Sequence, residues 1–219
     1  MRARNAEEIG HKWFLSVFAI TALIAGAGLL FLELADDMRE GDLDRFDTGV
    51  LAWIAHHRSP HLNYFFGAVT ALGSWPVLAI MTVGVCIGTW LARRGRMALA
   101  LAAAMTMAPV LSSVLKRMHG RPRPQVMPHL DAVASTSFPS GHTIGSVVFC
   151  TTLALLIAQH ARGRAMAIFL ACYSALVGAL VAASRVYLGV HYPSDVAGGA
   201  LVAIAWSLAV LLVDRRLRG

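Results

Sequence analysis

The sequence predicts an all-α membrane protein with six transmembrane helices in a single domain, residues 1–219. Of its 219 residues, 57% are hydrophobic and only 14% are charged. The mean hydropathy of +0.63 is far above what a soluble domain of this size needs. The apolar residues also collect in long uncharged runs, and about 20 such residues are enough to cross a bilayer as a helix.

The first predicted span covers residues 13–32. No small-residue cleavage site separates it from the connector that follows, so we interpret it as a retained helix and not as a signal peptide. The connector is acidic and contains Glu33, Asp36, Asp37, Glu40, Asp42, Asp44 and Asp47. The next two segments, 46–57 and 60–74, have the pattern of amphipathic helices that lie at the membrane interface.

A break at Gly73-Ser74-Trp75-Pro76 starts the second span, residues 76–92, because serine is a common N-cap and proline is tolerated in a first turn. The other predicted spans are residues 97–115, 143–159, 165–183 and 196–213. Small residues at Gly84-xxx-Gly88 and Gly198-Gly199-Ala200 predict faces on which neighbouring helices pack closely.

The distribution of arginine predicts the orientation in the membrane. The N-terminus, the turns at 93–96 and 162–164 and the C-terminal tail are basic and fall on one side, which the positive-inside rule makes cytoplasmic. The acidic connector, the loop 116–142 and the connector 184–195 then share the outer face. We attribute the net charge of +7 to the arginines that set the orientation in the membrane. Because no basic run is interleaved with aromatic residues, no nucleic-acid partner is expected.

Three basic side chains of the outer loops, Lys116, Arg123 and Arg185, indicate an anionic ligand. Each one alone is typical of a helix end whose long side chain reaches towards water. Together, with few acids near them in sequence, they favour a group with several charged oxygens, of which phosphate is the obvious one.

Ser140, Gly141 and His142 open the fourth predicted span. Serine is a common N-cap, glycine lets the backbone approach a ligand closely, and the free amides of a helix N-terminus attract anions. The alternative is an ordinary helix cap with a histidine beside it.

His191 and Asp195 are four residues apart across Pro193, which is expected to start the sixth span. Asp195 would then lie in the first turn and reach back to an imidazole N–H of His191. A carboxylate in that place orients the ring and leaves its other nitrogen free as a nucleophile. The alternative is a helix-capping acid near a loop histidine.

Neither a metal nor another cofactor is expected. The outer loops that carry the basic groups offer Mg²⁺ few carboxylates, and three cations already supply positive charge. Cys86, Cys150 and Cys172 show no paired spacing, so we interpret them as small core residues and not as a zinc site or a disulfide framework.

Three motifs follow one another between residues 116 and 195. Lys116 to Arg123-Pro124 fits KxxxxxxRP, residues 139–142 fit PSGH, and residues 184–195 fit SRxxxxxHxxxD. The first motif can be placed only on Arg123, because the residue seven before Arg121 is Val114. Together the motifs resemble the signature of the type 2 phosphatidic acid phosphatase (PAP2) superfamily.

This resemblance implies a metal-independent phosphatase with a role for each motif residue. His191 would attack phosphorus and form a phosphohistidine, Asp195 would orient it, and His142 would protonate the leaving oxygen. The residues implied to hold the phosphoryl oxygens are Lys116, Arg123, Ser140, Gly141 and Arg185. The resemblance assigns no role to the acidic connector, Arg117, Arg121 or His119, and it predicts no oligomeric state.

The implied substrate is a phosphate-bearing membrane lipid, met at headgroup depth on the outer face of a bacterial inner membrane. Undecaprenyl diphosphate is expected first, because phosphate leaves more easily than an alkoxide, and phosphatidylglycerol phosphate or phosphatidic acid second. Lipid A is a further candidate. Two other functions stay open: a phosphotransferase that uses a polyprenyl diphosphate donor, and a transporter or non-catalytic protein that binds anionic lipids. The transporter would need charged groups inside the spans, whereas here they lie at span ends. The soluble haloperoxidases of the superfamily do not fit a chain with six spans.

The orientation can be tested with topology reporters. Reporters fused after residue 94, after residue 163 and at the C-terminus are expected in the cytoplasm, and reporters inserted at 36–44 or 125–135 outside it. A cytoplasmic reporter within 125–135 would contradict the predicted orientation.

Overall fold

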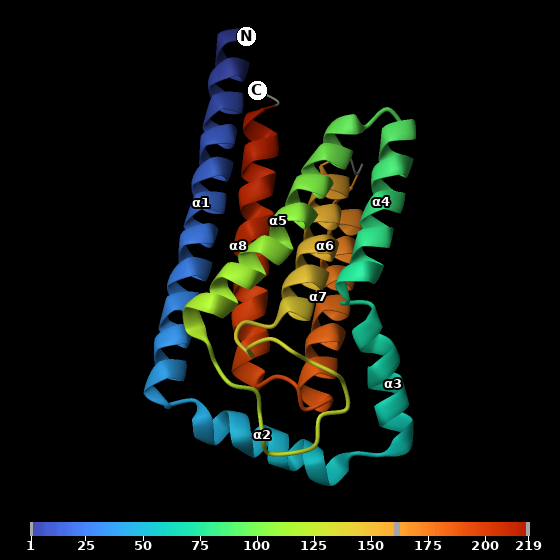
Figure 1. The fold of residues 1–219 in the computed structure, drawn as a ribbon. Coiled ribbons are helices and arrows are strands. Elements are labelled where there is room, and N and C mark those ends of the chain that lie inside the picture. Colours follow the sequence, from blue (N-terminus) through green and yellow to red (C-terminus); the bar gives the residue numbers. More distant parts are fainter. Residues whose placement is uncertain (1, 160–162, 218–219) are drawn as a thin grey trace.

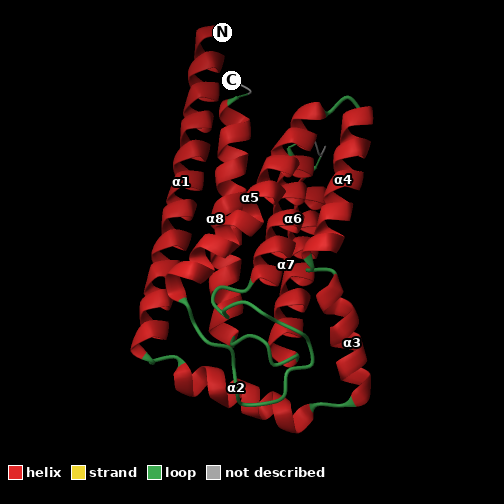
Figure 2. Cartoon of the chain, in the orientation of Figure 1, coloured by secondary structure: helices red, strands yellow, loops and turns green. Residues whose placement is uncertain are grey.

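The computed structural model describes residues 2–159 and 163–217, with side chains of the first helix from Phe14 onwards. This part of the chain folds into eight helices and no strand, which confirms the all-α prediction (Figure 1; Figure 2). The helices are α1 (Arg2–Glu40), α2 (Asp44–His57), α3 (Pro60–Ala71), α4 (Trp75–Leu91), α5 (Gly95–His119), α6 (Gly141–Ala158), α7 (Arg164–Tyr187) and α8 (Pro193–Arg216).

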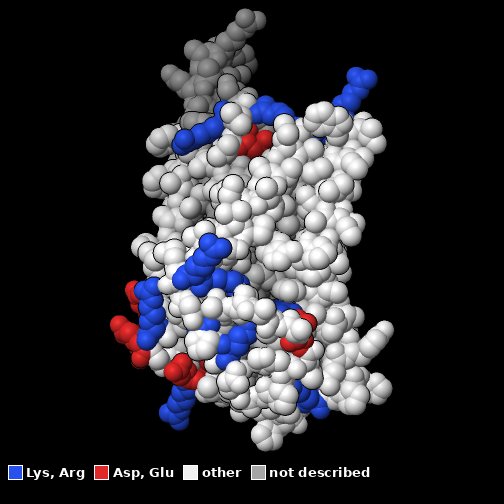
Figure 3. Space-filling model, in the orientation of Figure 1, with Lys and Arg blue, Asp and Glu red and all other residues white. Residues whose placement is uncertain are grey.

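Five of these helices are long and apolar enough to cross a membrane by themselves: α1 from Phe14, α5, α6, α7 and α8. The helix α4 is shorter, and it reaches the length of a span only together with α3, to which it is joined at a bend of 48°. The structure therefore has five spans, or six when the bent pair is counted as one. Figure 3 shows charged residues along the upper end and over the lower half of the visible face, with an uncharged band between them.

The centre of the bundle is α6, which packs against α4, α5, α7 and α8 and is the most buried of the five spans. Small residues allow this close packing. A side chain at Gly199 of α8 would meet the carbonyl oxygen of Ser140 at 2.9 Å and Thr143 at 3.2 Å, and one at Gly178 of α7 would meet Val147 at 2.8 Å.

The small-residue prediction is confirmed at Gly198 and Gly199, where a side chain on Gly198 would meet Phe138 at 2.6 Å. It is wrong at Gly84 and Gly88, because among the described residues nothing lies within 4 Å of a side chain added at either position. Both glycines are exposed on α4. Cys172 is exposed on α7, so its assignment to the core is also wrong.

All the segments singled out as functional lie at one end of the bundle. In Figure 1, α2 runs across this end, beside the loop between α5 and α6 and the connector between α7 and α8, while the first turn of α1 and the last turn of α8 lie at the other end. Residue 162, which opens the predicted basic turn at 162–164, lies outside the described residues.

Several predicted boundaries change at this end, and one of them is that α5 continues past residue 115 to His119, so that Lys116 lies on a helix and not in the loop. The acidic connector is mostly helical, since α1 continues to Glu40 and α2 begins at Asp44 after a short turn at Gly41. In addition, α7 runs past its predicted end to Tyr187, because the first residue with a left-handed backbone after it is Gly189. Arg185 therefore lies on a helix and not on the connector.

The contact between α6 and α8 predicts a stability difference between two glycine substitutions. Gly199→Ala pushes a methyl group against the backbone of Ser140, so it should destabilise the protein by about 1–3 kcal/mol. Gly88→Ala is the matched control, because the added methyl group meets open space and alanine is the better helix former. Thermal unfolding in detergent measures both, and equal midpoints for the two variants would contradict the packing described here.

Candidate active site

The predicted site residues come together where the ends of four helices meet. Lys116 lies in the last turn of α5, and Arg185 lies in the last turn of α7. Ser140, Gly141 and His142 begin α6, while Asp195 lies in the first turn of α8. The remaining two predicted residues, Arg123 and His191, come from the α5–α6 loop and the α7–α8 connector.

His191 is buried, with 2% of its surface exposed, and both of its ring nitrogens have partners. Nδ1 lies 3.3 Å from Oδ2 of Asp195, and Nε2 lies 3.1 Å from Nη1 of Arg123. Because a guanidinium can only donate, Nε2 must offer its lone pair, and the proton of the neutral ring belongs on Nδ1, where it is donated to Asp195. The expected pairing of His191 with Asp195 is present.

The environment keeps His191 neutral. Burial, together with the charges of Arg123 and Lys116, lowers the pKa of His191 to about 3, although Asp195 opposes this shift. The imidazole is therefore unprotonated at neutral pH, with the lone pair of Nε2 available for chemistry.

Asp195 is completely buried and its two oxygens have different partners. Oδ2 faces His191, and it also accepts hydrogen bonds from the backbone N–H of Tyr192, at 2.9 Å, and from the hydroxyl of Ser137. Oδ1 accepts a hydrogen bond from Arg121 at 2.8 Å. The carboxylate is thus fixed in place on both sides.

Lys116 and Arg123 are held by backbone carbonyls. Nζ of Lys116 donates to the carbonyls of Thr136 and Ser137, and Nε of Arg123 donates to that of Ser135 at 2.8 Å. Burial, and then the charge of Arg185, lower the pKa of Arg123 to about 10, so it stays charged at neutral pH. Neither Lys116 nor Arg123 forms a salt bridge within the described residues.

Arg185 is the most deeply buried of the three cations, with 1% of its surface exposed. Its Nη1 donates to Oγ1 of Thr70 and to Oδ2 of Asp131, each at 2.6 Å. Its Nε is buried and has no hydrogen-bond partner anywhere in the described part of the chain. A buried donor without a partner is uncommon in a folded protein, and here it leaves a position for a ligand oxygen.

The start of α6 supplies backbone donors. The N–H of Ser140 is already used, because it donates to the carbonyl of Asp195 at 3.0 Å, and the Ser140 side chain makes no capping hydrogen bond. The Ser140 side chain therefore accepts no hydrogen bond from the backbone N–H groups of the first turn, which begin with that of Gly141. A side chain on Gly141 would lie 3.1 Å from Oγ of Ser112 and 3.9 Å from Lys116, so the glycine places the backbone directly beside the lysine.

His142, the second residue of α6, is partly buried and close enough to interact electrostatically with Arg185, Asp131, Arg123 and Lys116. The structure therefore brings all eight predicted site residues into one cluster. No group of three or more possible metal ligands occurs in the part of the chain that is described.

Sequence reasoning missed several polar residues that support the cluster. They are Asp47, Arg121, Asp131, Ser137 and Ser194. Arg121 and Ser137 stand next to motif residues, and that proximity was a usable signal. Asp47 lies far away in sequence on α2, and nothing local marks it.

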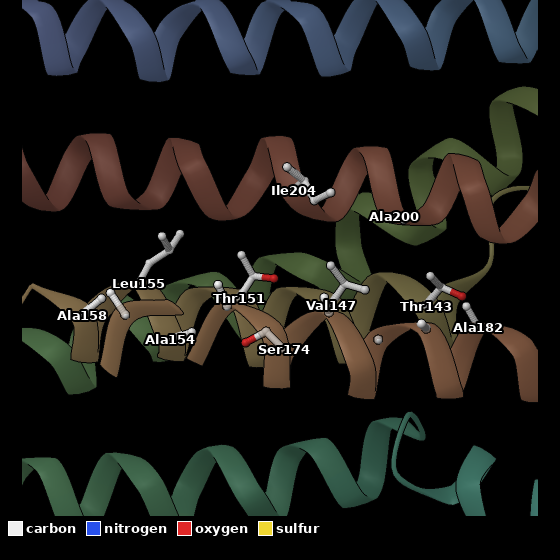
Figure 4. A pocket seen from close by; sticks show the side chains of 15 residues that line it. Thr143, Val147, Thr151, Ala154, Leu155, Ala158, Ser174, Ala182, Ala200 and Ile204 are labelled. Carbon is white, nitrogen blue, oxygen red and sulfur yellow. The ribbon is translucent and has the colours of Figure 1, made fainter. Parts of the chain in front are cut away.

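An apolar groove of about 540 Å³ runs between α6, α7 and α8 (Figure 4). Thr143 lies at one end of it and Ala158 at the other, and among the described residues no charged side chain lines it. The groove offers contacts for an aliphatic chain, and it is not the place of the charged chemistry described above.

Comparison with known proteins identifies the family. The family model described as PAP2 superfamily matches residues 97–218, which is more than half of the chain. The chain belongs to the PAP2 superfamily. This confirms the resemblance drawn from the three motifs.

Relatives of this PAP2 chain include named lipid phosphatases. It is 30% identical over 188 residues to phosphatidylglycerophosphatase B of Bacillus subtilis, covering 84% of this chain and 88% of that protein. It is 34% identical over 128 residues to decaprenylphosphoryl-5-phosphoribose phosphatase of Mycobacterium tuberculosis, covering 57% and 63%. It is 33% identical over 102 residues to undecaprenyl-diphosphatase BcrC of Bacillus subtilis, covering 43% and 46%.

Two solved structures have a fold similar to that of this chain. The first transmembrane PAP2 type phosphatidylglycerolphosphate phosphatase from Bacillus subtilis matches with a TM-score of 0.83 and 26% identity, covering 89% of this chain and 96% of that one. LpxE of Aquifex aeolicus matches with a TM-score of 0.59 and 28% identity, covering 76% and 94%. The protein is therefore an integral membrane phosphatase of the PAP2 type.

Proposed function

We propose that this PAP2 phosphatase hydrolyses the phosphate of a membrane lipid through a phosphohistidine on His191. The observation that carries the proposal is the state of His191, which is buried and neutral, oriented by Asp195, with Nε2 facing Arg123. A nucleophile held beside Lys116 and Arg123, which form no salt bridge within the described residues, suits an anionic electrophile.

The first step of the proposed reaction transfers the phosphoryl group to the enzyme. The phosphoryl oxygens replace Nε2 of His191 as the acceptor of the Arg123 hydrogen bond, and they also accept from Lys116 and from Nε of Arg185. Nε2 then forms a bond to phosphorus while the bond from phosphorus to the lipid oxygen breaks. His142 donates a proton to that oxygen, and Asp195 stabilises the positive charge on His191.

The second step returns the enzyme to its starting state. A water molecule attacks phosphorus, His142 accepts its proton, and the bond between phosphorus and Nε2 breaks. Inorganic phosphate leaves, and His191 is neutral again. The same donors hold the phosphoryl oxygens in both steps, so they stabilise both transition states.

The position of the site supports a lipid substrate. Because the catalytic residues lie at helix ends, a lipid can present its headgroup there while its chains stay in the bilayer. The proposed site faces the outer side of the membrane, with both termini cytoplasmic. The similarity to known proteins favours phosphatidylglycerol phosphate as the substrate. The Bacillus subtilis relative and the solved structure whose names contain this lipid both match this chain over most of their lengths. This reverses the order that the leaving-group argument alone predicts, and it places undecaprenyl diphosphate second.

Substitutions at the three catalytic residues test the proposed roles. His191→Ala should abolish turnover, and Asp195→Asn should lower it by about 10⁴-fold, as in a histidine triad that loses its orienting carboxylate. His142→Ala should slow the hydrolysis of phosphatidylglycerol phosphate more than that of undecaprenyl diphosphate, because a general acid matters most when the leaving oxygen is strongly basic.

The matched control is His61→Ala, which removes an exposed histidine of α3 and should leave turnover unchanged. Activity should resist EDTA and be inhibited by vanadate, which mimics five-coordinate phosphorus. Full turnover by His191→Ala would falsify the phosphohistidine route, and complete loss with EDTA would instead require a metal.

A comparison of three substrates tests the lipid preference. Phosphatidylglycerol phosphate, undecaprenyl diphosphate and a water-soluble phosphate ester are compared in proteoliposomes at equal bulk concentration. The two lipids should be cleaved faster, because the bilayer concentrates and orients them, and phosphatidylglycerol phosphate should lead. Equal or faster cleavage of the soluble ester would contradict a lipid substrate, and transfer of phosphate to a second lipid instead of water would contradict hydrolysis.

A further inference from the structure

Arg121 is buried behind the active site and joins two carboxylates that are far apart in sequence. Its Nη1 donates to Oδ1 of Asp195 at 2.8 Å and to Oγ of Ser194 at 2.7 Å. Its Nη2 donates to Oδ2 of Asp47, also at 2.8 Å. The guanidinium carbon lies 4.0 Å from the centre of the Tyr192 ring, which covers its face.

Asp47 is completely buried and ties α2 to the start of α8. Its Oδ1 accepts a hydrogen bond from the backbone N–H of Ser194, one of the first-turn amides of α8, at 3.0 Å. Its Oδ2 accepts from the Ser194 hydroxyl and from Arg121. A carboxylate at this place stabilises the helix N-terminus that carries Asp195.

The arrangement fixes the Asp195 carboxylate from the side opposite to His191. One oxygen of Asp195 binds Arg121, and the other faces Nδ1 of His191. The bidentate fork of arginine sets the direction of both carboxylates that it contacts. The guanidinium also gives the buried carboxylate of Asp195 a partner of opposite charge.

We propose that Arg121 and Asp47 are positioning residues for the nucleophile, acting through Asp195 to hold the imidazole of His191 in its attacking orientation. This assigns a role to Arg121 and to one residue of the acidic segment, and it rests on the proposed function of His191. Arg121 is not a catalytic residue, because the contacts of both terminal nitrogens lie on the Asp47 and Asp195 side, away from Nε2 of His191.

The test is a double-mutant cycle on hydrolysis of phosphatidylglycerol phosphate in detergent micelles. Arg121→Gln should lower kcat by about tenfold or more and change KM less than twofold, since the residue orients a reacting group but does not touch substrate. Arg123→Gln, which removes a contact to the phosphoryl group, should raise KM as well.

The cycle distinguishes positioning from a merely structural role. If Arg121 acts through Asp195, then the double variant Arg121→Gln with Asp195→Asn should be no slower than Asp195→Asn alone. If the double variant loses kcat by the product of the two single losses, the proposal is overturned. A wild-type kcat in Arg121→Gln would overturn it as well. If His191→Ala is inactive while Arg121→Gln is fully active, then this inference fails and the proposed function stands.

Asp47→Asn is a gentler second variant, because it keeps the shape of the side chain and leaves Arg121 in place. It should lower kcat without raising KM, and it decides the matter if Arg121→Gln does not elute as a folded protein from a sizing column.

Two charge controls accompany these variants: Arg117→Gln removes an exposed arginine of α5, and Asp44→Asn removes an exposed carboxylate of α2 that lies 3.9 Å from Arg121. Both should keep the kcat of the wild type. Wild-type kcat in Asp47→Asn, or a loss in the controls as large as in Asp47→Asn, would overturn the role of Asp47.

Discussion

The contact between Asp195 and His191 is the interaction on which the rest of the structure depends. It needs a completely buried carboxylate, and a buried charge is costly unless other groups satisfy it. Arg121 and the hydroxyl of Ser137, both from the α5–α6 loop, and the backbone of Tyr192 from the α7–α8 connector supply those groups. The backbone of Asp195 also accepts from Ser140, which ties the start of α8 to the start of α6.

The bundle of helices makes this meeting of ends possible. Because the centre of α6 lies against four neighbours, small shifts of any of them would move the helix start that carries Gly141 and His142. Gly199 and Gly178 let α8 and α7 approach α6 closely, which sets how near their ends come to each other. The apolar spans therefore decide the geometry of a polar site that lies at their ends.

Much of this structure can be predicted from the sequence because the bilayer imposes a simple rule. An uncharged run of the right length must be a helix, since backbone groups cannot stay unpaired in lipid. The three motifs likewise point to all eight site residues, because each motif has fixed spacings and marks one helix end or connector. The start of α8 at Pro193 and the start of α6 after Ser140 coincide with local start signals in the sequence, although the Ser140 side chain forms no capping hydrogen bond.

Other features depend on contacts that no local pattern encodes. Arg185 was expected on a connector, but charges at helix ends do not stop a helix, and α7 continues until Gly189 allows a turn. Asp47 was one of several similar acids in one segment, and only the folded chain shows that it alone among them is buried against α8. Gly84 and Gly88 have the spacing of a packing face, but spacing does not say whether a neighbour is present.

The central claim is that the phosphoryl group passes through Nε2 of His191. The most direct measurement is to mix the enzyme with phosphatidylglycerol phosphate labelled in its terminal phosphate, stop the reaction within one turnover in alkali, which preserves phosphohistidine, and locate the label by peptide mass spectrometry. The account predicts label on the peptide with His191 in the wild type and in His61→Ala, and none in His191→Ala. Label on a different residue, or full turnover without any labelled enzyme, would contradict it.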